Sequence, residues 1–276
     1  MMPRFAWSVW GYLLAIAVVA FGAAVLSTIT VGRSTGPETA WLIRCVLIMC
    51  CVIAVTHVYL RHDRLAWRCY GVRFDSRSAT SCLVGFLSGI ALALLWTLVV
   101  WLWAPFDLQL NPSMRCEALF SGVAAAIALG IAEEVGYRSY ALERLDAQYG
   151  AIVGVLAPTA IFVLSHLSSG MPWKAAVLVV GTCSVLYGSL MLWTRSLPLV
   201  AAFHVANNVG QDALLRTSSG SLWLPVFADV DAAKMHQLGI WTSMAALNLF
   251  LAICIWTLWV RRPPGGPGSR RHRATS

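Results

Sequence analysis

The chain has 276 residues, of which 59% are hydrophobic and only 12% are charged. Soluble domains carry about a quarter charged residues, so this composition excludes a soluble globular fold and predicts a membrane protein. The net charge of +8 does not indicate a nucleic-acid partner, because no basic stretch is interleaved with aromatic residues on a soluble segment. The basic residues are mostly arginines between apolar runs, which favours contact with an anionic membrane surface.

Eight apolar runs follow one another along the chain. Each is about long enough to cross a ~30 Å hydrocarbon core as a helix, and helices satisfy the backbone hydrogen bonds that lipid cannot. The first run is longer than the ~7–15 apolar residues of a signal-peptide core, so we expect an uncleaved span. The seventh run is the weakest prediction, because it is short and carries polar residues. The predicted spans are 7–30, 40–60, 81–104, 117–140, 153–169, 174–194, 197–213 and 239–260.

These runs predict an all-α polytopic membrane helical bundle of about eight transmembrane helices, forming a single membrane domain over residues 1–276. With the N-terminus inside, fourteen Lys and Arg residues fall in inside segments and six in outside segments. The positive-inside rule therefore predicts a multi-pass protein of the cell membrane with both termini cytoplasmic. We expect residues 214–238 to form an outside loop with room for a surface helix. Residues 261–276, rich in Pro, Gly and Arg, are predicted to be a basic flexible cytoplasmic tail.

The eight cysteines show none of the spacing that marks a zinc site or a disulfide framework. None forms a Cys-x-x-Cys pair, and most lie inside apolar runs, so we interpret them as packing residues. They are Cys45, Cys50, Cys51, Cys69, Cys82, Cys116, Cys183 and Cys254.

Ionisable residues interrupt the fourth run at Glu133 and Glu134, with Arg138 four residues beyond the second. Ionisable groups at membrane depth are costly and indicate function. On a helix, Glu134 and Arg138 share a face and form a predicted ion pair. Glu133 points about 100° away, since a helix turns once in 3.6 residues. It has no obvious cation, which leaves it as the carboxylate available for chemistry.

Two later runs supply further polar groups. His166 lies in Phe162-Val163-Leu164-Ser165-His166, and His204 and Asn208 lie four residues apart on one face of the seventh run. At about 1.5 Å per residue, the depths of Glu133, His166 and His204 agree only to within two helical turns. They converge if the fifth helix starts after Gly154, tilts, or bends at Pro158.

The three motifs Glu-Glu-x-x-x-Arg, Phe-x-x-x-His and His-x-x-x-Asn, in this order, resemble those of the CAAX-processing and bacteriocin-processing (CPBP) family of glutamic intramembrane proteases. The resemblance covers a motif core of about residues 118–212. Many members carry Gly after the motif arginine, where this chain has Ser139. The resemblance implies a membrane endopeptidase that works without a metal or other cofactor on a membrane-associated peptide or protein.

The same residues can be given chemical roles. Glu133 is the candidate general base, and His166 is predicted to hold the attacking water and to protonate the leaving amine. His204 and Asn208 are candidate donors to the oxyanion. Glu134 and Arg138 are predicted to support them. These roles match those implied by the family.

Three other functions stay open at this stage. Glu133, His166 and His204 are a legitimate ligand set for a zinc protease, although no His-Glu-x-x-His is present. The carboxylates and histidines also fit a proton-coupled transporter, but the chain lacks paired halves. The third alternative is a non-catalytic member of the family, of the bacteriocin-immunity type. The sequence identifies neither the substrate nor the oligomeric state.

Overall fold

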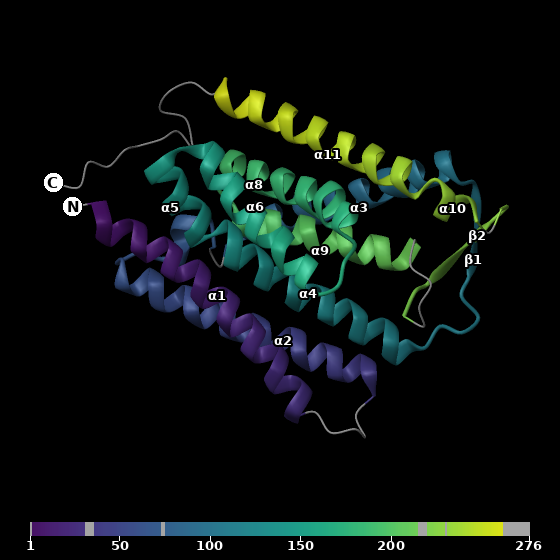
Figure 1. The fold of residues 1–276 in the computed structure, drawn as a ribbon, viewed down its shortest axis with the longest axis horizontal. Helices are drawn as coiled ribbons and strands as arrows, with labels where there is room; N and C mark the ends of the chain where they lie inside the picture. Colours follow the sequence, from purple (N-terminus) through teal and green to yellow (C-terminus); the bar gives the residue numbers. More distant parts are fainter. Residues whose placement is uncertain (1, 31–35, 73–74, 215–219, 230, 262–276) are drawn as a thin grey trace.

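The computed structural model describes residues 2–30, 36–72, 75–214, 220–229 and 231–261. Within these ranges it is a bundle of long helices with one small sheet (Figure 1). The helices of the first half are α1 (Met2–Thr30), α2 (Pro37–His62), α3 (Ser76–Trp103), α4 (Cys116–Arg138) and α5 (Tyr140–Tyr149), with a 3₁₀ turn η1 (Trp67–Tyr70). The second half holds α6 (Ala151–Ser168), α7 (Trp173–Ala175), a π-helical segment η2 (Ala176–Gly181), α8 (Thr182–Thr194), α9 (Leu197–Leu214), α10 (Ala232–Met235) and α11 (Gln237–Val260). The strands are β1 (Phe106–Leu110) and β2 (Trp223–Phe227).

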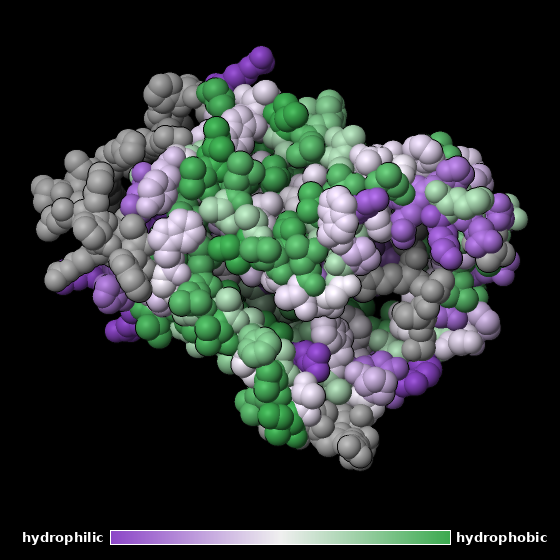
Figure 2. Space-filling model, in the orientation of Figure 1, coloured by the Kyte–Doolittle hydropathy of each residue, from purple (hydrophilic) through white to green (hydrophobic). Residues whose placement is uncertain are grey.

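Seven helical segments of the described chain are long and apolar enough to cross a membrane. They match seven of the eight predicted spans to within a few residues, and α9 forms a helix at the remaining one. Because α9 carries the polar motif residues, it is less apolar than the other seven. The all-α bundle is confirmed. Apolar side chains cover the middle of the visible face (Figure 2), and Phe21 and Phe120 are 73% and 72% exposed, as residues in contact with lipid are.

The bundle has two unlike ends. At the hairpin end, β1 and β2 pair antiparallel, with Phe106 opposite Phe227 and Leu110 opposite Trp223. At the opposite end lie the loop after α2, helix α5 and the last turn of α11 (Figure 1). We call this second end the arginine end. The arginines there whose side chains the structure describes are Arg61, Arg64, Arg68, Arg77, Arg144, Arg195 and Arg261.

Two predicted segments lie partly or wholly outside the described residues. The expected outside loop 214–238 contains β2 and α10 where it is described, so it is more ordered than a plain loop. The strand pairing had no clear sequence signal, since each strand has only five residues. The predicted basic tail 261–276 is described only at Arg261.

The fourth predicted span does not continue straight to residue 140. α4 ends at Arg138, and Ser139 takes φ −88° and ψ −103° before α5 begins. The last carbonyls of a helix lack intrahelical donors. Here the Ser139 hydroxyl donates to the Val135 carbonyl, and the Tyr12 hydroxyl donates to the Gly136 carbonyl at 3.0 Å. Two of the last carbonyls of α4 are therefore hydrogen-bonded at the break, and α5 turns the chain back toward α6.

Helices α3 and α9 meet backbone to backbone. A Cβ atom at Gly85 would lie 2.1 Å from the Leu199 carbonyl oxygen, and one at Gly89 would lie 2.2 Å from the Phe203 carbonyl oxygen. Only glycine permits this approach. The contact fixes the position of α9, and with it that of His204, against α3.

The cysteines are all free thiols, as far as the structure describes the chain. Cys45 and Cys183 are buried, as packing residues are. Cys50, Cys69 and Cys116 are exposed, so the packing role predicted for them is wrong. Cys82 is exposed too, but its thiol contacts the Pro198 carbonyl of α9.

Candidate active site

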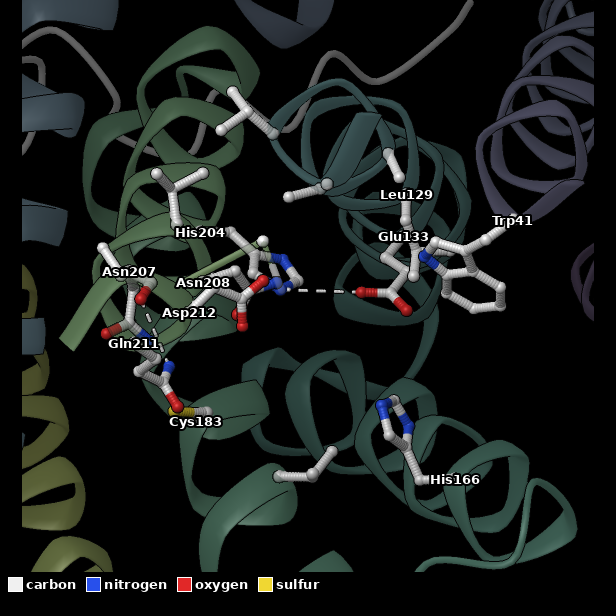
Figure 3. Close-up of a pocket in the computed structure, with 18 of the residues that line it drawn as sticks. Trp41, Leu129, Glu133, His166, Cys183, His204, Asn207, Asn208, Gln211 and Asp212 are labelled. Atoms are coloured by element: carbon white, nitrogen blue, oxygen red, sulfur yellow. Dashed lines mark hydrogen bonds and ion pairs between the residues drawn. The ribbon is translucent and has the colours of Figure 1, made fainter. Parts of the chain in front are cut away.

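The polar motif residues surround one cavity of about 510 Å³ (Figure 3). Glu133 on α4, His166 on α6, and His204 and Asn208 on α9 all line it. The structure therefore brings together the residues whose depths in the sequence agreed only roughly. It does so with α6 starting at Ala151, directly after Gly150 at φ +88°, rather than after Gly154.

Glu134 and Arg138 form the ion pair that their spacing predicts. Arg138 Nη1 lies 3.2 Å from Glu134 Oε1, and the Glu134 side chain is fully buried. Glu133 points to the cavity instead, with 16% of its side chain exposed. Adjacent residues on one helix thus have different surroundings, as the 100° step between them requires.

His204 contacts both glutamates, which the sequence did not predict. Its Nδ1 lies 2.7 Å from Glu134 Oε1, and its Nε2 lies 3.5 Å from Glu133 Oε2. Because a carboxylate oxygen accepts, Nδ1 carries the hydrogen that is shared with Glu134. Among the described residues Glu133 forms no ion pair with Lys or Arg, and its neighbour is the ring of His204, which is a cation only when protonated.

Arg138 is surrounded by acceptors and aromatic rings. Its Nη2 donates to the Ser184 hydroxyl at 2.8 Å, and Ser184 is in turn 2.8 Å from the Thr159 hydroxyl. The guanidinium carbon lies 4.8 Å from the ring centroid of Phe162 and 5.7 Å from that of Tyr187. Cation–π contacts of this kind stabilise a desolvated arginine. Arg138 is therefore held where it neutralises Glu134.

His166 lies across the cavity from Glu133, with its ring directed into the space between them (Figure 3). Its Nδ1 is 2.9 Å from the Phe162 carbonyl oxygen, which accepts, so in the neutral ring Nδ1 carries the hydrogen. Nε2 is then free to accept on the cavity side. The motif Phe-x-x-x-His has a structural basis here, because the Phe162 ring packs against His166 with centroids 4.5 Å apart.

The neighbouring asparagines of α9 have different partners. Asn208 lines the cavity beside His204 (Figure 3). Asn207 is buried, and its amide donates to the Tyr187 hydroxyl at 3.1 Å. The ring of Tyr187 in turn lies 4.7 Å from that of His204. Asn207 lines the cavity as well, and its hydrogen bond holds Tyr187 in the cavity wall.

Sequence reasoning missed three residues that hold the site: Ser184, Tyr187 and Asn207. Ser184 and Tyr187 lie in an apolar run without charge or repeat, so no pattern marked them. Asn207 is three residues after His204 and so shares a helical face with it. That spacing was a usable signal.

Metal ligation was the main alternative for this set of residues. Among the described residues, no group of three His, Cys, Asp or Glu side chains is placed to hold a metal ion. Glu133, His166 and His204 surround a cavity, but they do not converge on one point within it.

Residues 115–210 match the family model described as Type II CAAX prenyl endopeptidase Rce1-like. The chain matches no curated protein and no solved structure. The matched stretch contains Glu133, His166, His204 and Asn208. The resemblance carried by the three motifs is therefore confirmed, and residues 115–210 of this polytopic helical protein are an Rce1-like segment.

Proposed function

We propose that the chain is an intramembrane endopeptidase of the glutamic type, in which Glu133 activates the water that attacks a peptide bond. The observation that carries this proposal is the contrast between the two glutamates. Glu134 is buried and paired with Arg138 and His204, whereas Glu133 opens into a cavity shared with two histidines and an amide. The match to an Rce1-like endopeptidase model supports the same reaction class.

The proposed chemistry uses groups on opposite walls of the cavity. Water between Glu133 and His166 gives a proton to Glu133 as its oxygen attacks the carbonyl carbon. The negative charge moves to the carbonyl oxygen, which accepts from the Asn208 amide and from His204 Nε2 when this nitrogen is protonated. As the carbonyl reforms and the C–N bond breaks, His166 Nε2 takes the proton from Glu133 and passes it to the leaving amine, so that Glu133 is again a carboxylate. Fixed donors aimed at an oxyanion contribute a factor of about 10²–10³ each.

The proposed substrate is a membrane-associated peptide or protein, because the cavity lies within helices whose outer surfaces are apolar. Exposed Leu14, Phe86 and Ile253 belong to three different helices and face outward into lipid. We place the protein in the cell membrane as a single membrane domain, with both termini cytoplasmic, on the basic-residue asymmetry of the sequence.

Comparative proteomics of the membrane fraction tests the proposal. Cells with Glu133→Gln should accumulate one or a few uncleaved substrates that wild-type cells process. Glu117→Gln is the matched control, since this glutamate lies on the same helix with a 66% exposed side chain. Identical peptide termini in wild type and Glu133→Gln at equal protein level would contradict the enzyme and favour a non-catalytic member of the family.

A chelator separates the glutamic mechanism from a zinc protease with the same residues. We expect cleavage by the purified protein to survive a strong chelator, since the described ligand candidates are not arranged as a metal site. Cleavage that is lost on chelation and recovered on adding Zn²⁺ would show that a metal ion, and not Glu133 as general base, activates the attacking water.

A further inference from the structure

The two ends of the bundle differ in the sign of their net charge, counted over the described side chains. The arginine end has seven arginines whose side chains the structure describes, against four acidic residues, which are Asp63, Asp75, Glu143 and Asp146. The hairpin end has four described cations, Arg44, Arg115, Lys174 and Lys234, against six acidic residues, Glu38, Asp107, Glu117, Asp212, Asp229 and Asp231. Basic residues gather on the cytoplasmic side of membrane proteins. The arginine end is therefore the cytoplasmic end, in agreement with the count over the whole sequence.

The candidate site is closed toward this cytoplasmic end. Nine consecutive residues, from Glu134 to Leu142, are buried directly below Glu133. Beyond them, Asp63 accepts from the Tyr140 hydroxyl at 2.7 Å and pairs with Arg144. Arg195 pairs with Glu143 and lies 3.3 Å from Asp146. These contacts tie α2, α5 and the α8–α9 connection together across the arginine end.

The cavity extends toward the hairpin end instead. Its lining includes Glu38 and Trp41 in the first turns of α2, Ala118 in the first turn of α4, Asp212 in the last turn of α9, and Gly220 just before β2. At about 1.5 Å per residue, Glu133 lies ~26 Å along α4 from Cys116. The cavity therefore leads from the hairpin end down to the carboxylate, and its wall contains no described residue of the arginine end.

We infer that the substrate reaches Glu133 from the non-cytoplasmic side of the membrane, through the opening at the hairpin end. This inference rests on the proposed function and names the substrate class as a peptide segment exposed at, or anchored in, the outer face. A peptide tail held at the cytoplasmic surface meets the closed arginine end and does not reach the carboxylate.

Sided thiol labelling tests the inference without requiring catalysis. Two native cysteines mark the ends, because exposed Cys69 lies in the loop after α2 and exposed Cys116 starts α4 at the hairpin end. Ala126→Cys adds a thiol on the cavity wall, and Ala124→Cys on the same helix is the matched control, since Ala124 does not line the cavity. A membrane-impermeant maleimide is applied to intact cells and to inverted membrane vesicles, and labelled sites are mapped by mass spectrometry.

Cys116 and the Ala126→Cys thiol should be labelled from outside only, Cys69 from inside only, and the Ala124→Cys thiol from neither side until the protein is denatured. Labelling of the Ala126→Cys thiol from inverted vesicles, from both sides or from neither would overturn the inference, as would labelling of Cys69 from outside. The same experiment is run on Glu133→Gln protein, where loss of catalysis cannot alter the outcome. A substrate search that fails while the labelling succeeds therefore counts against the proposed function alone.

Discussion

The Nδ1 atom of His204 lies 2.7 Å from Oε1 of Glu134, although the two residues are seventy positions apart in the sequence. This hydrogen bond joins α9 to α4 in the middle of the bundle and turns the other ring nitrogen of His204 toward Glu133. Glu134 accordingly does more than neutralise Arg138. It fixes the orientation of the imidazole that faces the cavity. In the proposed mechanism, Glu133 is therefore the catalytic glutamate and Glu134 the positioning one.

Glu133→Gln should abolish cleavage without loss of stability. Glutamine keeps the shape of the side chain and removes the base, which costs about 10²–10⁴ in rate for a general acid–base residue. The carboxylate is partly exposed to the cavity, so its charge contributes little to the fold. Cleavage rate and melting temperature in detergent are measured together. Wild-type cleavage in this variant would rule out Glu133 as the base.

Glu134→Gln should lose stability as well as cleavage. It leaves Arg138 as an uncompensated charge in a fully buried position, and removing one partner of a buried pair costs about 3–5 kcal/mol. Adding Arg138→Met should restore much of the melting temperature, because no lone charge remains. If Glu133→Gln melts far below Glu134→Gln, the division of roles is wrong.

The adjacent asparagines provide a matched pair of variants. Asn208→Ala should reduce cleavage by a factor of about 10²–10³, the loss typical of one oxyanion donor, with an unchanged melting temperature. Asn207→Ala should instead destabilise the protein by about 1–3 kcal/mol, because it removes a buried hydrogen bond to Tyr187. Equal losses of cleavage at equal stability in the two variants would contradict the assignment of Asn208.

Asn248→Leu should destabilise the bundle at a position that does not itself line the cavity, although its partners Trp96 and Cys183 do. The Asn248 side chain accepts from Trp96 Nε1 at 3.2 Å and donates to the Thr182 hydroxyl at 3.0 Å, which joins α3, η2–α8 and α11. Leucine leaves the buried Trp96 N–H without this acceptor, at a cost of about 1–3 kcal/mol. Thermal unfolding in detergent measures the loss. An unchanged melting temperature would show that the three helices are held by apolar packing alone.

The Asp63 cluster predicts a pH dependence at the arginine end. Burial raises the pKa of the Asp63 carboxyl, but hydrogen bonds from Tyr140 and His62 and the charge of Arg144 outweigh it, so the pKa lies below its usual value. A depressed carboxyl pKa stabilises the fold above the unfolded value of about 3.9, and this contribution is lost as the pH falls through the folded pKa.

Asp63→Asn should therefore lower stability at neutral pH by about 1–2 kcal/mol, a figure reduced for partial solvent exposure. Its difference from wild type should shrink below about pH 4. Asp107→Asn, at an exposed position of β1, is the control and should show no such trend. A difference that stays constant between pH 7 and pH 3 would exclude the ionic contribution of Asp63.

Length and hydropathy were sufficient to predict the helices, because a backbone in lipid has few alternatives. The helical period of 3.6 residues was likewise sufficient to predict that Glu134 pairs with Arg138 and that Glu133 points in another direction. The break at Ser139 was not predictable, since it depends on a hydroxyl from Tyr12, more than a hundred residues earlier in the chain. For the same reason, the contact of His204 with Glu134 needs the packing of α9 on α4, which no local pattern contains.

The glycine contact between α3 and α9 has a consequence for how the protein moves. With Gly85 and Gly89 in van der Waals contact with carbonyls of α9, a shift of α9 would force backbone atoms into each other or leave buried backbone without neighbours. The last turn of α6 is under no such constraint, because Leu164 and Ser165 beside His166 are exposed. We therefore expect a peptide too large for the resting cavity to displace the end of α6 while α9 stays in place. In the proposed mechanism, His166 then moves as the substrate enters, while His204 and Asn208 remain stationary.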